Sequence, residues 1–438
     1  MSAGTRKDWI ASRGDALQGS VAVPGDKSVS HRAIMLAAIA DGESRIEGFL
    51  EGEDTRATAA IFAQLGVRIE APDSGVRVVH GVGIDGLQAP RHPLDCGNAG
   101  TAMRLLAGLL AGQRFGSVLV GDASLTRRPM SRVIEPLSRM GAHVDSESGG
   151  FPPLRIQPAE RLQAIDFQAE IASAQLKSAV LLAGLSASGT TIVREPQPTR
   201  DYTERMLAAF GWPIEFEPGL VHLPGGHRLR ATDVQVPADF SSAAFLIVAA
   251  TVVPGSALTL RKVGVNPRRT GLLRVLRAMG ADIVESNRGE QRGEPVADLV
   301  VRHAPLRGIE VPIGHVADMI DEFPALFIAA ACASGTTVIR GAAELRVKES
   351  DRIGTMASGL RTLGITVDER TDGAAIHGGR MGPATVDSHG DHRVAMAFAI
   401  AGQVAEGEVR IHDVANVATS FPHFDALARQ AGFGLRAP

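Results

Sequence analysis

Cysteine is almost absent from this sequence, since Cys96 and Cys332 are its two cysteines in 438 residues. Two cysteines cannot build a disulfide framework, and no Cys/His spacing is typical of a zinc site. Long apolar runs are also missing: the longest extend over about 10 to 14 residues, whereas a membrane-spanning helix needs about 20. The N-terminal stretch MSAGTRKDWIASRGD lacks the apolar core of a secretory signal. These absences predict a reducing, cytoplasmic location and no membrane partner.

An excess of basic residues is missing as well. The 45 lysines and arginines are outnumbered by 48 aspartates and glutamates, which gives a net charge of −3. Nucleic-acid-binding proteins usually carry a strong basic excess, so we expect no nucleic-acid partner. The stretch GVGIDG matches a dinucleotide-binding loop, but LQAP follows it where such a loop would open a helix. His389 and His392 are spaced for a metal pair but lack an evident third ligand.

What the sequence does contain is one pattern repeated six times. Each copy begins with an apolar run that ends in glycine, and the six runs are AIMLAAIADG, RLLAGLLAG, AVLLAGLSASG, AAFLIVAATVVPG, ALFIAAACASG and VAMAFAIAG. A β-branched stretch and an amphipathic helix follow, and a second glycine then stands at Gly66, Gly141, Gly211, Gly280, Gly364 or Gly432. Glycine just past the last apolar turn is a common helix stop. The pattern predicts six units of roughly seventy residues.

These units predict an α/β fold with two domains. Helices that are apolar on all sides must be buried on all sides, so other layers must surround them. Six long units divide more naturally into two domains of three repeats than into an open solenoid. We place one domain at residues 21–239 and the other at residues 1–20 plus 240–438, because VQVPADFSSAAF separates repeats three and four. The connection would then be a two-stranded hinge.

Polar residues stand at the entrance of each apolar helix, in GDKS, CGNAGTAMR, SAQLKS, ADFSS, MIDEFP and HGDHR. A helix N-terminus carries unpaired N–H groups and a partial positive charge, and three-fold packing would bring several of these ends together. The cations at these entrances and before the second helices are Lys27, Arg32, Arg104, Lys177 and Arg393, with Arg127, Arg128, Arg200, Arg346, Lys348 and Arg352. Together they predict a site for multiply charged small molecules. For any single arginine the alternative is a solvated surface side chain.

Carboxylates lie among these cations. Asp321 and Glu322 stand at the entrance of the fifth apolar helix, and Glu349 lies within RVKESDR. With Lys27 they would form a general acid/base set in an anion-rich pocket. The alternatives are a helix N-cap for Asp321 and a salt bridge from Glu349 to a neighbouring cation. The sequence leaves both alternatives open.

Taken in order, GDKSVSHR, GNAGTAMR, RRPM, SAQLK, DEFP, RVKESDR and DHRVAMAF resemble the motifs of the 5-enolpyruvylshikimate-3-phosphate synthases. The resemblance implies two inside-out α/β domains, each of three βαβαββ repeats, that close around shikimate 3-phosphate and phosphoenolpyruvate. It implies transfer of the enolpyruvyl group to the 5-hydroxyl of shikimate 3-phosphate with release of phosphate, a step of chorismate and aromatic amino acid biosynthesis. It also implies a monomer that needs no metal or organic cofactor.

The resemblance further implies a role for each matching residue. Lys27 would touch both substrates. The other contacts to shikimate 3-phosphate would be Ser28, Arg32, Ser173, Ala174, Gln175, Arg200, Asp321 and Lys348, and those to phosphoenolpyruvate would be Gly100, Arg128, Gln175, Arg352 and Arg393. Asp321 would accept the proton of the attacking hydroxyl. Glu349, with Lys27, would transfer protons at the methylene carbon and the leaving phosphate.

Two positions depart from the family pattern. Ala418 and Thr419 stand where many members carry a lysine, so that contact is absent or supplied elsewhere. Gly100 stands where glyphosate-tolerant members often have alanine, so we expect at least partial inhibition by glyphosate. Two alternative functions stay open: a UDP-N-acetylglucosamine enolpyruvyl transferase of the same fold, and a non-catalytic repeat protein that binds phosphorylated ligands. Against the first, the loop GDASLTRRPM lacks the cysteine usual in that enzyme.

Overall fold

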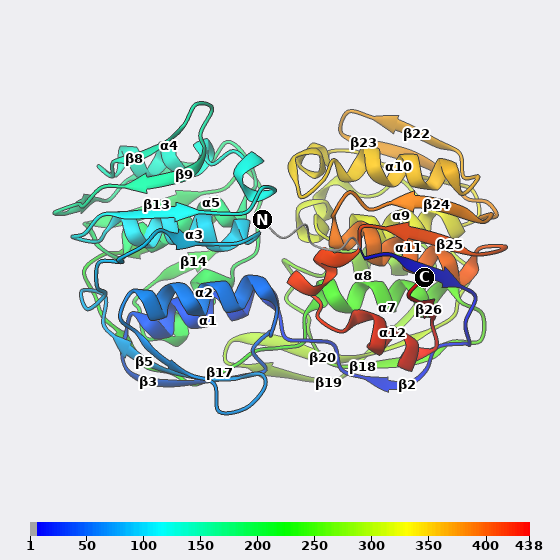
Figure 1. The fold of residues 1–438 in the computed structure, drawn as a ribbon, viewed down its shortest axis with the longest axis horizontal. Coiled ribbons are helices and arrows are strands. Elements are labelled where there is room, and N and C mark those ends of the chain that lie inside the picture. Colours follow the sequence, from blue (N-terminus) through cyan, green and yellow to red (C-terminus); the bar gives the residue numbers. More distant parts are fainter. Residues whose placement is uncertain (1–6) are drawn as a thin grey trace. The chain divides into compact units, whose positions relative to one another are not determined.

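The computed structural model describes residues 7–438, which form two compact units (Figure 1). Unit 1 comprises the described residues up to Pro24, Ala238–Gly289 and Pro295–Pro438, and unit 2 comprises Gly25–Pro237 and Glu290–Glu294. The first six residues of the predicted segment 1–20 lie outside the described residues. None of the described helices has the length and apolarity to cross a membrane.

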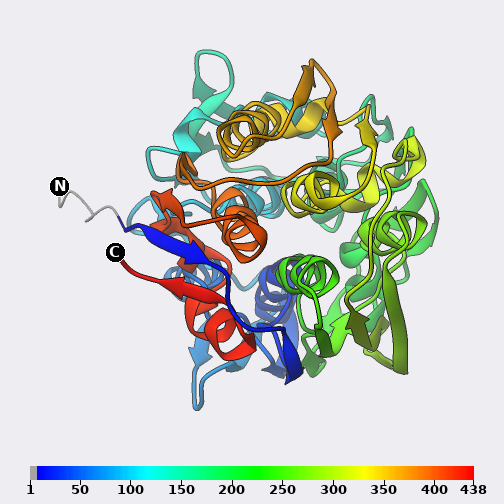
Figure 2. The ribbon, with the colours of Figure 1, turned by 90° about the vertical axis from the view of Figure 1, so that its right-hand side faces the viewer.

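All six predicted apolar helices are present. They are α1 (Lys27–Ala38), α3 (Gly100–Ala111) and α5 (Ala174–Gly184) in unit 2, and α7 (Phe240–Val252), α9 (Phe323–Cys332) and α11 (His392–Val404) in unit 1. In unit 1, α7, α9 and α11 pack against one another, and Figure 2 views them nearly end-on. All 13 residues of α7 are buried. Complete burial of this kind is what an all-apolar helix requires.

The six amphipathic helices are also confirmed. They are α2 (Glu53–Gln64), α4 (Ser131–Arg139), α6 (Tyr202–Ala209), α8 (Gly271–Ala278), α10 (Arg352–Thr362) and α12 (Phe424–Ala431). The glycine that follows each of them has a φ angle between 82° and 118°. Glycine takes this left-handed conformation without the steric cost that other residues pay. The repeated glycine therefore marks a real helix stop in every unit.

Three larger sheets surround the helices of unit 2. The first sheet contains β3 (Ala40–Glu47), β4 (Arg68–Glu70), β5 (Val76–Val82), β16 (Leu229–Arg230) and β17 (Val234–Gln235). The second sheet contains β6 (Leu94–Asp95), β7 (Ser117–Val120), β8 (Val144–Glu147) and β9 (Phe151–Ile156). The third sheet contains β11 (Asp166–Gln168), β13 (Thr190–Arg194), β14 (Glu215–Glu217) and β15 (Leu220–Pro224). In each sheet the strand after the buried helix has one antiparallel partner from its own repeat and a parallel partner from another repeat. Because β16 and β17 of the third repeat pair with β3 of the first, the three repeats close into a ring. A short pair, β10 (Leu162–Gln163) and β12 (Ala187–Ser188), lies outside these sheets.

Unit 1 has the same plan. Its sheets contain β2 (Gln18–Val21), β18 (Ala257–Gly264), β19 (Asp282–Gln291) and β20 (Glu294–Arg302); β21 (Thr336–Ile339), β22 (Val367–Arg370) and β23 (Gly373–His377); and β1 (Trp9–Ser12), β24 (Ala384–Asp387), β25 (Val409–His412) and β26 (Gly434–Arg436). The N-terminal strands complete two of them: β1 lies between β25 and β26, and β2 pairs in parallel with β18. N-terminal residues therefore belong to the same unit as the C-terminal half of the chain.

The chain passes between the units at residues 23–26 and 236–239, and these two segments have matching sequences, VPGD and VPAD. The backbone N–H of Asp26 donates to the carbonyl of Pro237, and that of Asp239 donates to the carbonyl of Pro24, both at 2.8 Å. Asp26 then caps α1 and Asp239 caps α7 through their side chains. The two connecting segments thus pair with each other and lead directly into the first buried helix of each unit.

Candidate active site

Arg32 is the central buried cation of unit 2, and its side chain is held by three neutral acceptors. Its Nε donates to Thr203 Oγ1 at 2.7 Å, Nη2 donates to Ser178 Oγ at 2.8 Å and Nη1 donates to the carbonyl of Ser28 at 3.0 Å. Burial lowers the pKa of Arg32 to about 10, against the opposing charge of Glu204. The guanidinium is thus fixed in orientation and still charged near neutral pH, which suits an anionic ligand.

Lys27 and Arg200 lie near Arg32. Lys27 is the first residue of α1, its side chain is 18 % exposed, and its Nζ lies 3.0 Å from Asp54 Oδ2. Arg200 lies in the loop before α6, close enough to Arg32 for its charge to lower the pKa of that arginine. Ser28 is partly exposed beside Lys27. The structure therefore brings these four predicted residues to one end of α1.

Gln175 joins the entrances of α3 and α5. Its Oε1 accepts from Arg104 Nη1 at 2.9 Å, and its Nε2 donates to Thr101 Oγ1 at 2.8 Å. Ser173 caps α5 with its side chain, and Ala174 is the first helical residue. The predicted trio of residues 173–175 therefore lies at the positive end of a buried helix, where an anion is favoured.

Arg128 and Gly100 lie beside the entrance of α3. The Arg128 side chain is buried, and its Nη2 donates to Asn98 Oδ1 at 2.6 Å and to Ser124 Oγ at 3.1 Å. A Cβ atom added to Gly100 would lie 3.0 Å from Arg104 Nη1 and 3.1 Å from Arg128 Nη1. Glycine at position 100 therefore leaves free the space in front of the two guanidinium groups.

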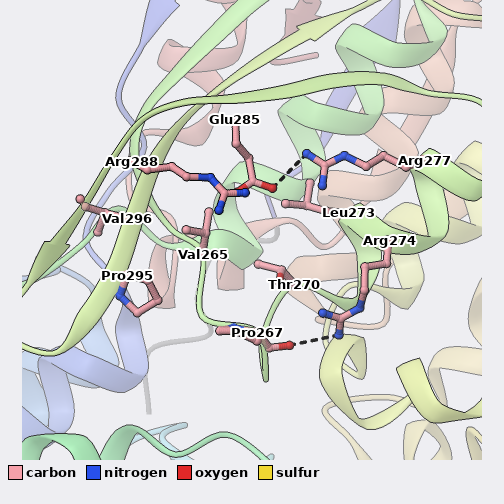
Figure 3. Close-up of a pocket in the computed structure, with 11 residues that line it drawn as sticks. Val265, Pro267, Thr270, Leu273, Arg274, Arg277, Glu285, Arg288, Pro295 and Val296 are labelled. Atoms are coloured by element: carbon pink, nitrogen blue, oxygen red, sulfur yellow. Dashed lines mark hydrogen bonds and ion pairs between the residues drawn. The ribbon is translucent and has the colours of Figure 1, made fainter.

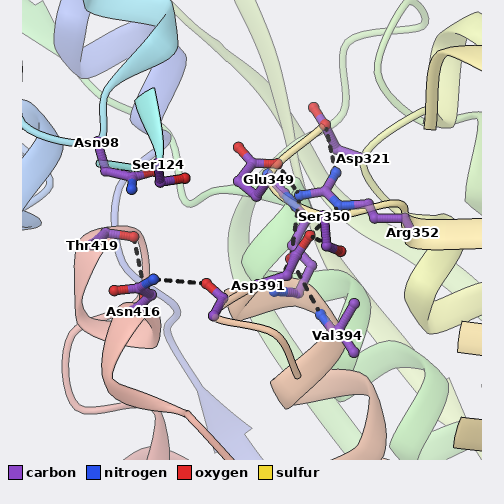
Figure 4. Close-up of polar contacts among 12 residues, drawn as sticks. Asn98, Ser124, Asp321, Glu349, Ser350, Arg352, Asp391, Val394, Asn416 and Thr419 are labelled. Atoms are coloured by element: carbon purple, nitrogen blue, oxygen red, sulfur yellow. Dashed lines mark hydrogen bonds and ion pairs between the residues drawn. The ribbon is translucent and has the colours of Figure 1, made fainter. Parts of the chain in front are cut away.

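In unit 1, Arg352 holds three carboxylates together (Figure 4). It is 1 % exposed, and it donates from Nε to Asp391 at 2.8 Å, from Nη2 to Glu349 at 2.6 Å and from Nη1 to Asp321 at 3.4 Å. The Ser350 hydroxyl adds a hydrogen bond to Asp391 at 3.1 Å. Burial alone would lower the pKa of Arg352, but the three carboxylates outweigh burial and raise it. Arg352 is therefore a permanent cation that orients Asp321 and Glu349.

The structure decides the two alternatives that the sequence left open. Asp321 is not the N-cap of α9, because Glu322 occupies that position and makes no side-chain cap hydrogen bond. Glu349 does form the salt bridge to Arg352. The side chains of Asp321 and Glu349 remain 17 % and 23 % exposed, so a ligand can reach both carboxylates.

Lys348 and Arg393 complete the predicted residues of unit 1. Desolvation lowers the pKa of Lys348, with the charge of Asp321 opposing it, so the ammonium lies near that carboxylate. Arg393 is the second residue of α11, and its backbone N–H donates to Asp391 at 2.9 Å. Among residues 7–438 no hydrogen bond or ion pair to the Arg393 guanidinium is formed, which leaves its donors available to a ligand.

Two cations predicted for the anion site are engaged elsewhere. Lys177 is 3 % exposed and lies between Glu195 and Glu204, at 2.9 and 2.7 Å. Arg346 forms surface ion pairs, one of them with Asp351 at 2.6 Å. For these two residues the prediction of an anion contact was wrong. Each charge is neutralised by nearby carboxylates that the sequence does not place beside it.

Asp391 is a buried residue of this site that sequence reasoning missed. Its carboxylate is fully buried, caps α11 and receives Arg352 Nε. The signal was present in the sequence, because GDKS, ADFSS and GDHR each place an aspartate directly before a buried helix. In all three cases that aspartate is the side-chain N-cap.

Neither a metal cluster nor the surface cavity of unit 1 adds to this site. Among the described side chains, no three His, Cys, Asp or Glu residues are grouped to hold a metal ion. A cavity of about 390 Å³ lies between α8 and the β19–β20 hairpin (Figure 3), and none of the predicted site residues lines it. Arg277 and Arg288 on its rim share Glu285, at 3.0 and 2.9 Å. Cys96 and Cys332 are free thiols, and burial raises the pKa of both.

His31 links this region to a dependence of stability on pH. Burial first, and then the charges of Lys27 and Arg32, lower the pKa of His31 well below 6.5. His31 therefore binds a proton more strongly in the unfolded chain than in the folded one. As the pH falls below about 6.5, the free energy of unfolding falls by about 1.4 kcal/mol for each pH unit until the lower pKa of the folded state is reached. In urea unfolding at pH 7.5 and 5.5, we expect His31→Gln to lose less stability on acidification than wild type. The exposed-site variant His143→Gln is expected to behave like wild type, and equal losses in all three proteins would contradict the prediction.

Comparison with known proteins gives consistent matches over nearly the whole chain. The family described as EPSP synthase (3-phosphoshikimate 1-carboxyvinyltransferase) matches residues 11–427. The chain is 70% identical over 429 residues to the 3-phosphoshikimate 1-carboxyvinyltransferase of Xanthomonas campestris pv. campestris (strain B100), covering 98% of each chain. It is 69% identical over 427 residues to the protein of the same name from Xanthomonas axonopodis pv. citri (strain 306), covering 98% of this chain and 97% of that one.

Solved structures agree with this result. EPSP synthase from Acinetobacter baumannii matches with a TM-score of 0.89 and 48% identity, covering 99% of this chain and 100% of that one. The enolpyruvyl transferase NikO from Streptomyces tendae matches with a TM-score of 0.80 at 19% identity, covering 99% of each chain, and so supports the fold alone. These matches confirm the predicted fold.

Proposed function

The chain belongs to the EPSP synthase family, and we propose that it transfers the enolpyruvyl group of phosphoenolpyruvate to the 5-hydroxyl of shikimate 3-phosphate and releases phosphate. The observation that carries this proposal is the 70% identity, over 98% of the chain, to a relative named for that activity. The chain is accordingly a transferase of the shikimate pathway that acts on small molecules.

We propose that the residues at the helix entrances of unit 2 bind shikimate 3-phosphate. They are Lys27, Ser28, Arg32, Ser173, Ala174, Gln175 and Arg200. Three features support this assignment: the charge of Arg32 is met by neutral acceptors, Arg200 lies near it, and residues 173–175 stand at the positive end of α5. From unit 1, Lys348 and Asp321 contribute further contacts to this substrate.

We assign phosphoenolpyruvate to a second set of residues, most of them cations. Arg128, Gly100 and Gln175 lie at the α3 and α5 entrances of unit 2, and Arg352 and Arg393 lie in unit 1, with Lys27 shared between the substrates. Arg393 supports this role because the residue is 8 % exposed and its guanidinium donors are available. Together the substrates carry two phosphates and two carboxylates, whose mutual repulsion such fixed cations offset.

The proposed mechanism is an addition followed by an elimination. Asp321 accepts the proton of the 5-hydroxyl as its oxygen adds to C2 of phosphoenolpyruvate, and Glu349, with Lys27, directs a proton to C3. The tetrahedral intermediate then loses phosphate from C2 and a proton from C3, which gives the enolpyruvyl ether. Arg352 contacts both carboxylates and orients them for these transfers.

Phosphate release from phosphoenolpyruvate tests this function directly. The purified chain is assayed with shikimate 3-phosphate and, separately, with UDP-N-acetylglucosamine as the acceptor. We expect release with shikimate 3-phosphate alone. Release with the sugar nucleotide alone would favour the alternative enolpyruvyl transferase, and release with neither would favour a non-catalytic binding protein.

We also propose that the protein is a monomer located in the cytoplasm. Light scattering coupled to size-exclusion chromatography tests the first part, with the mass of one chain as the expected result. Cell fractionation tests the second part, and recovery in the soluble cytoplasmic fraction is the expected result.

Gly100→Ala is expected to weaken both phosphoenolpyruvate binding and inhibition by glyphosate. The added methyl group would lie 3.0–3.1 Å from the guanidinium groups of Arg104 and Arg128, and these must shift to accept it. A packing cost of about 1–2 kcal/mol corresponds to a roughly tenfold higher KM for phosphoenolpyruvate. Steady-state kinetics with glyphosate as a competitor measures both effects.

Gly116→Ala is the matched control for this variant. Its Cβ would meet neighbouring atoms at ordinary contact distances of 3.6 and 3.8 Å, so we expect no change in either constant. Wild-type enzyme that resists millimolar glyphosate would contradict the expected inhibition. An unchanged KM in Gly100→Ala would contradict the proposed placement of phosphoenolpyruvate.

A further inference from the structure

A buried charge cluster in unit 2 lies beside the residues that hold Arg32. Lys177 of α5 forms ion pairs with Glu195, the residue that follows β13, and with Glu204 of α6. The three side chains are 3 %, 2 % and 1 % exposed. A buried lysine in the first turn of a buried helix carries a desolvation penalty, so its two carboxylate partners are required. The cluster therefore ties α5, β13 and α6 to a single ammonium group.

On both α5 and α6, a residue of the charge cluster is the direct chain neighbour of a residue that contacts Arg32. Ser178 follows Lys177 on α5, and Thr203 precedes Glu204 on α6. The Ser178 and Thr203 hydroxyls lie 2.7 Å apart, and both accept hydrogen bonds from Arg32. An ion pair and a hydroxyl pair thus connect the same two helices, and the orientation of Arg32 depends on their spacing.

The same cluster fixes the loop that carries Arg200. Glu195 Oε2, which accepts from Lys177, also accepts from the backbone N–H of Thr199 at 3.3 Å. The Thr199 hydroxyl makes a second, short contact to Glu195. Arg200 is the next residue, so the start of its backbone is anchored to Lys177 through one carboxylate.

Buried charges of both signs lie in this region. Lys177 and Arg32 are buried cations, and Glu195, Glu204 and Asp26 supply buried carboxylates. Burial raises the pKa of Glu204 while Lys177 opposes this, and the Glu204 charge in turn supports the charge of Arg32. Loss of the Glu204 charge would remove one of the two partners of Lys177 and the largest carboxylate contribution to the charge of Arg32.

We infer that Lys177, Glu195 and Glu204 are positioning residues for Arg32 and Arg200, and that they set the affinity for the phosphorylated acceptor but not for phosphoenolpyruvate. The inference rests on the proposed function, because that function assigns both arginines to shikimate 3-phosphate. None of the three residues is required to touch a substrate. Their effect is transmitted through the α5–α6 spacing and through the 195–200 loop.

Glu204→Gln is the principal test, since the substitution removes a charge and nearly preserves the shape. We expect the KM for shikimate 3-phosphate and its dissociation constant in the absence of phosphoenolpyruvate to rise about 10- to 100-fold, since misplacing a binding group by about 1 Å can cost about 100-fold. The KM for phosphoenolpyruvate and kcat are expected to stay within about threefold of wild type, because the arginines assigned to phosphoenolpyruvate, Arg128, Arg352 and Arg393, lie outside α5 and α6. Lys177→Arg, which keeps the charge, is expected to recover part of the affinity that Lys177→Met loses.

Glu51→Gln is the matched control in the same unit. Glu51 pairs with the buried Arg77 at 2.7 Å, away from α5 and α6. Its loss is expected to lower stability and leave both KM values unchanged. If Glu204→Gln does not fold, Thr199→Val tests the same link by removing the hydroxyl contact to Glu195.

The outcomes separate this inference from the proposed function. If the wild-type enzyme turns over and Glu204→Gln binds shikimate 3-phosphate with unchanged affinity, the inference is overturned and the proposed function stands. Parallel changes in both KM values, which would show an effect that is not specific to the acceptor, would also overturn it. If the wild-type enzyme shows no turnover, the proposed function is overturned. Calorimetry with inorganic phosphate then tests the inference separately. The inference predicts that phosphate binds more weakly to Glu204→Gln than to wild type, and equal binding to the two proteins would overturn it.

Discussion

Asp321→Asn is expected to lower kcat by about 10²- to 10⁴-fold, the usual contribution of a general base. The amide has nearly the same shape and still accepts a hydrogen bond from Arg352, but it cannot take up the proton of the attacking hydroxyl. Asp321 does not cap α9, and Arg352 keeps its fully buried partner Asp391 in this variant. We therefore expect the free energy of unfolding to fall by no more than about 2 kcal/mol.

Phosphate release and urea unfolding together check this prediction. Asp368→Asn, at an exposed residue of β22, is the control and is expected to change neither quantity. A kcat within threefold of wild type would contradict the role of Asp321 as proton acceptor. A large fall in kcat accompanied by a comparable loss of stability would instead indicate a structural role.

Arg352→Met is expected to destabilise unit 1 by about 3–5 kcal/mol, the cost of leaving buried charges unpaired. Arg352 is 1 % exposed, and its loss leaves Asp391 fully buried without its cation. Asp321 and Glu349 lose the group that orients them, so we also expect phosphate release to fall below a hundredth of the wild-type rate, as for misplaced catalytic groups.

Arg346→Met provides a control from the same RVKESDR segment. Arg346 pairs with Asp351 and Glu369, but its side chain is 26 % exposed, and surface pairs contribute about 0–1 kcal/mol. Urea unfolding of both variants measures the difference. Equal destabilisation by the two substitutions would contradict the distinct role assigned to Arg352.

The architecture of the chain could be predicted because its signals are local and repeated. An all-apolar run predicts a buried helix wherever it occurs, and a glycine after an amphipathic helix predicts a left-handed stop. The structure bears out both signals in all six repeats. The ring closure through β16 and β17 was not predicted in detail, because their short pairing with β3 joins residues that are far apart in the sequence.

The site was only partly predictable because the sequence does not show which charges face each other. Lys177 and Arg32 both stand near a helix entrance, yet Lys177 is neutralised by two carboxylates while Arg32 is held by hydroxyl and carbonyl groups. Asp391 was missed for the same reason, since its partner Arg352 lies 39 positions earlier. Pairings of this kind depend on tertiary packing and not on local pattern.

The placement of β1 has a consequence for the synthesis of the chain. Most of unit 2 is a continuous segment, Gly25–Pro237, which can fold while the ribosome is still translating the rest. The strand β1 leaves the ribosome before that segment, but its partners β25 and β26 are among the last strands to be made. Unit 1 can therefore reach its complete sheet only after β25 and β26 have been synthesised. Their emergence becomes the event that allows strand β1 to find its place.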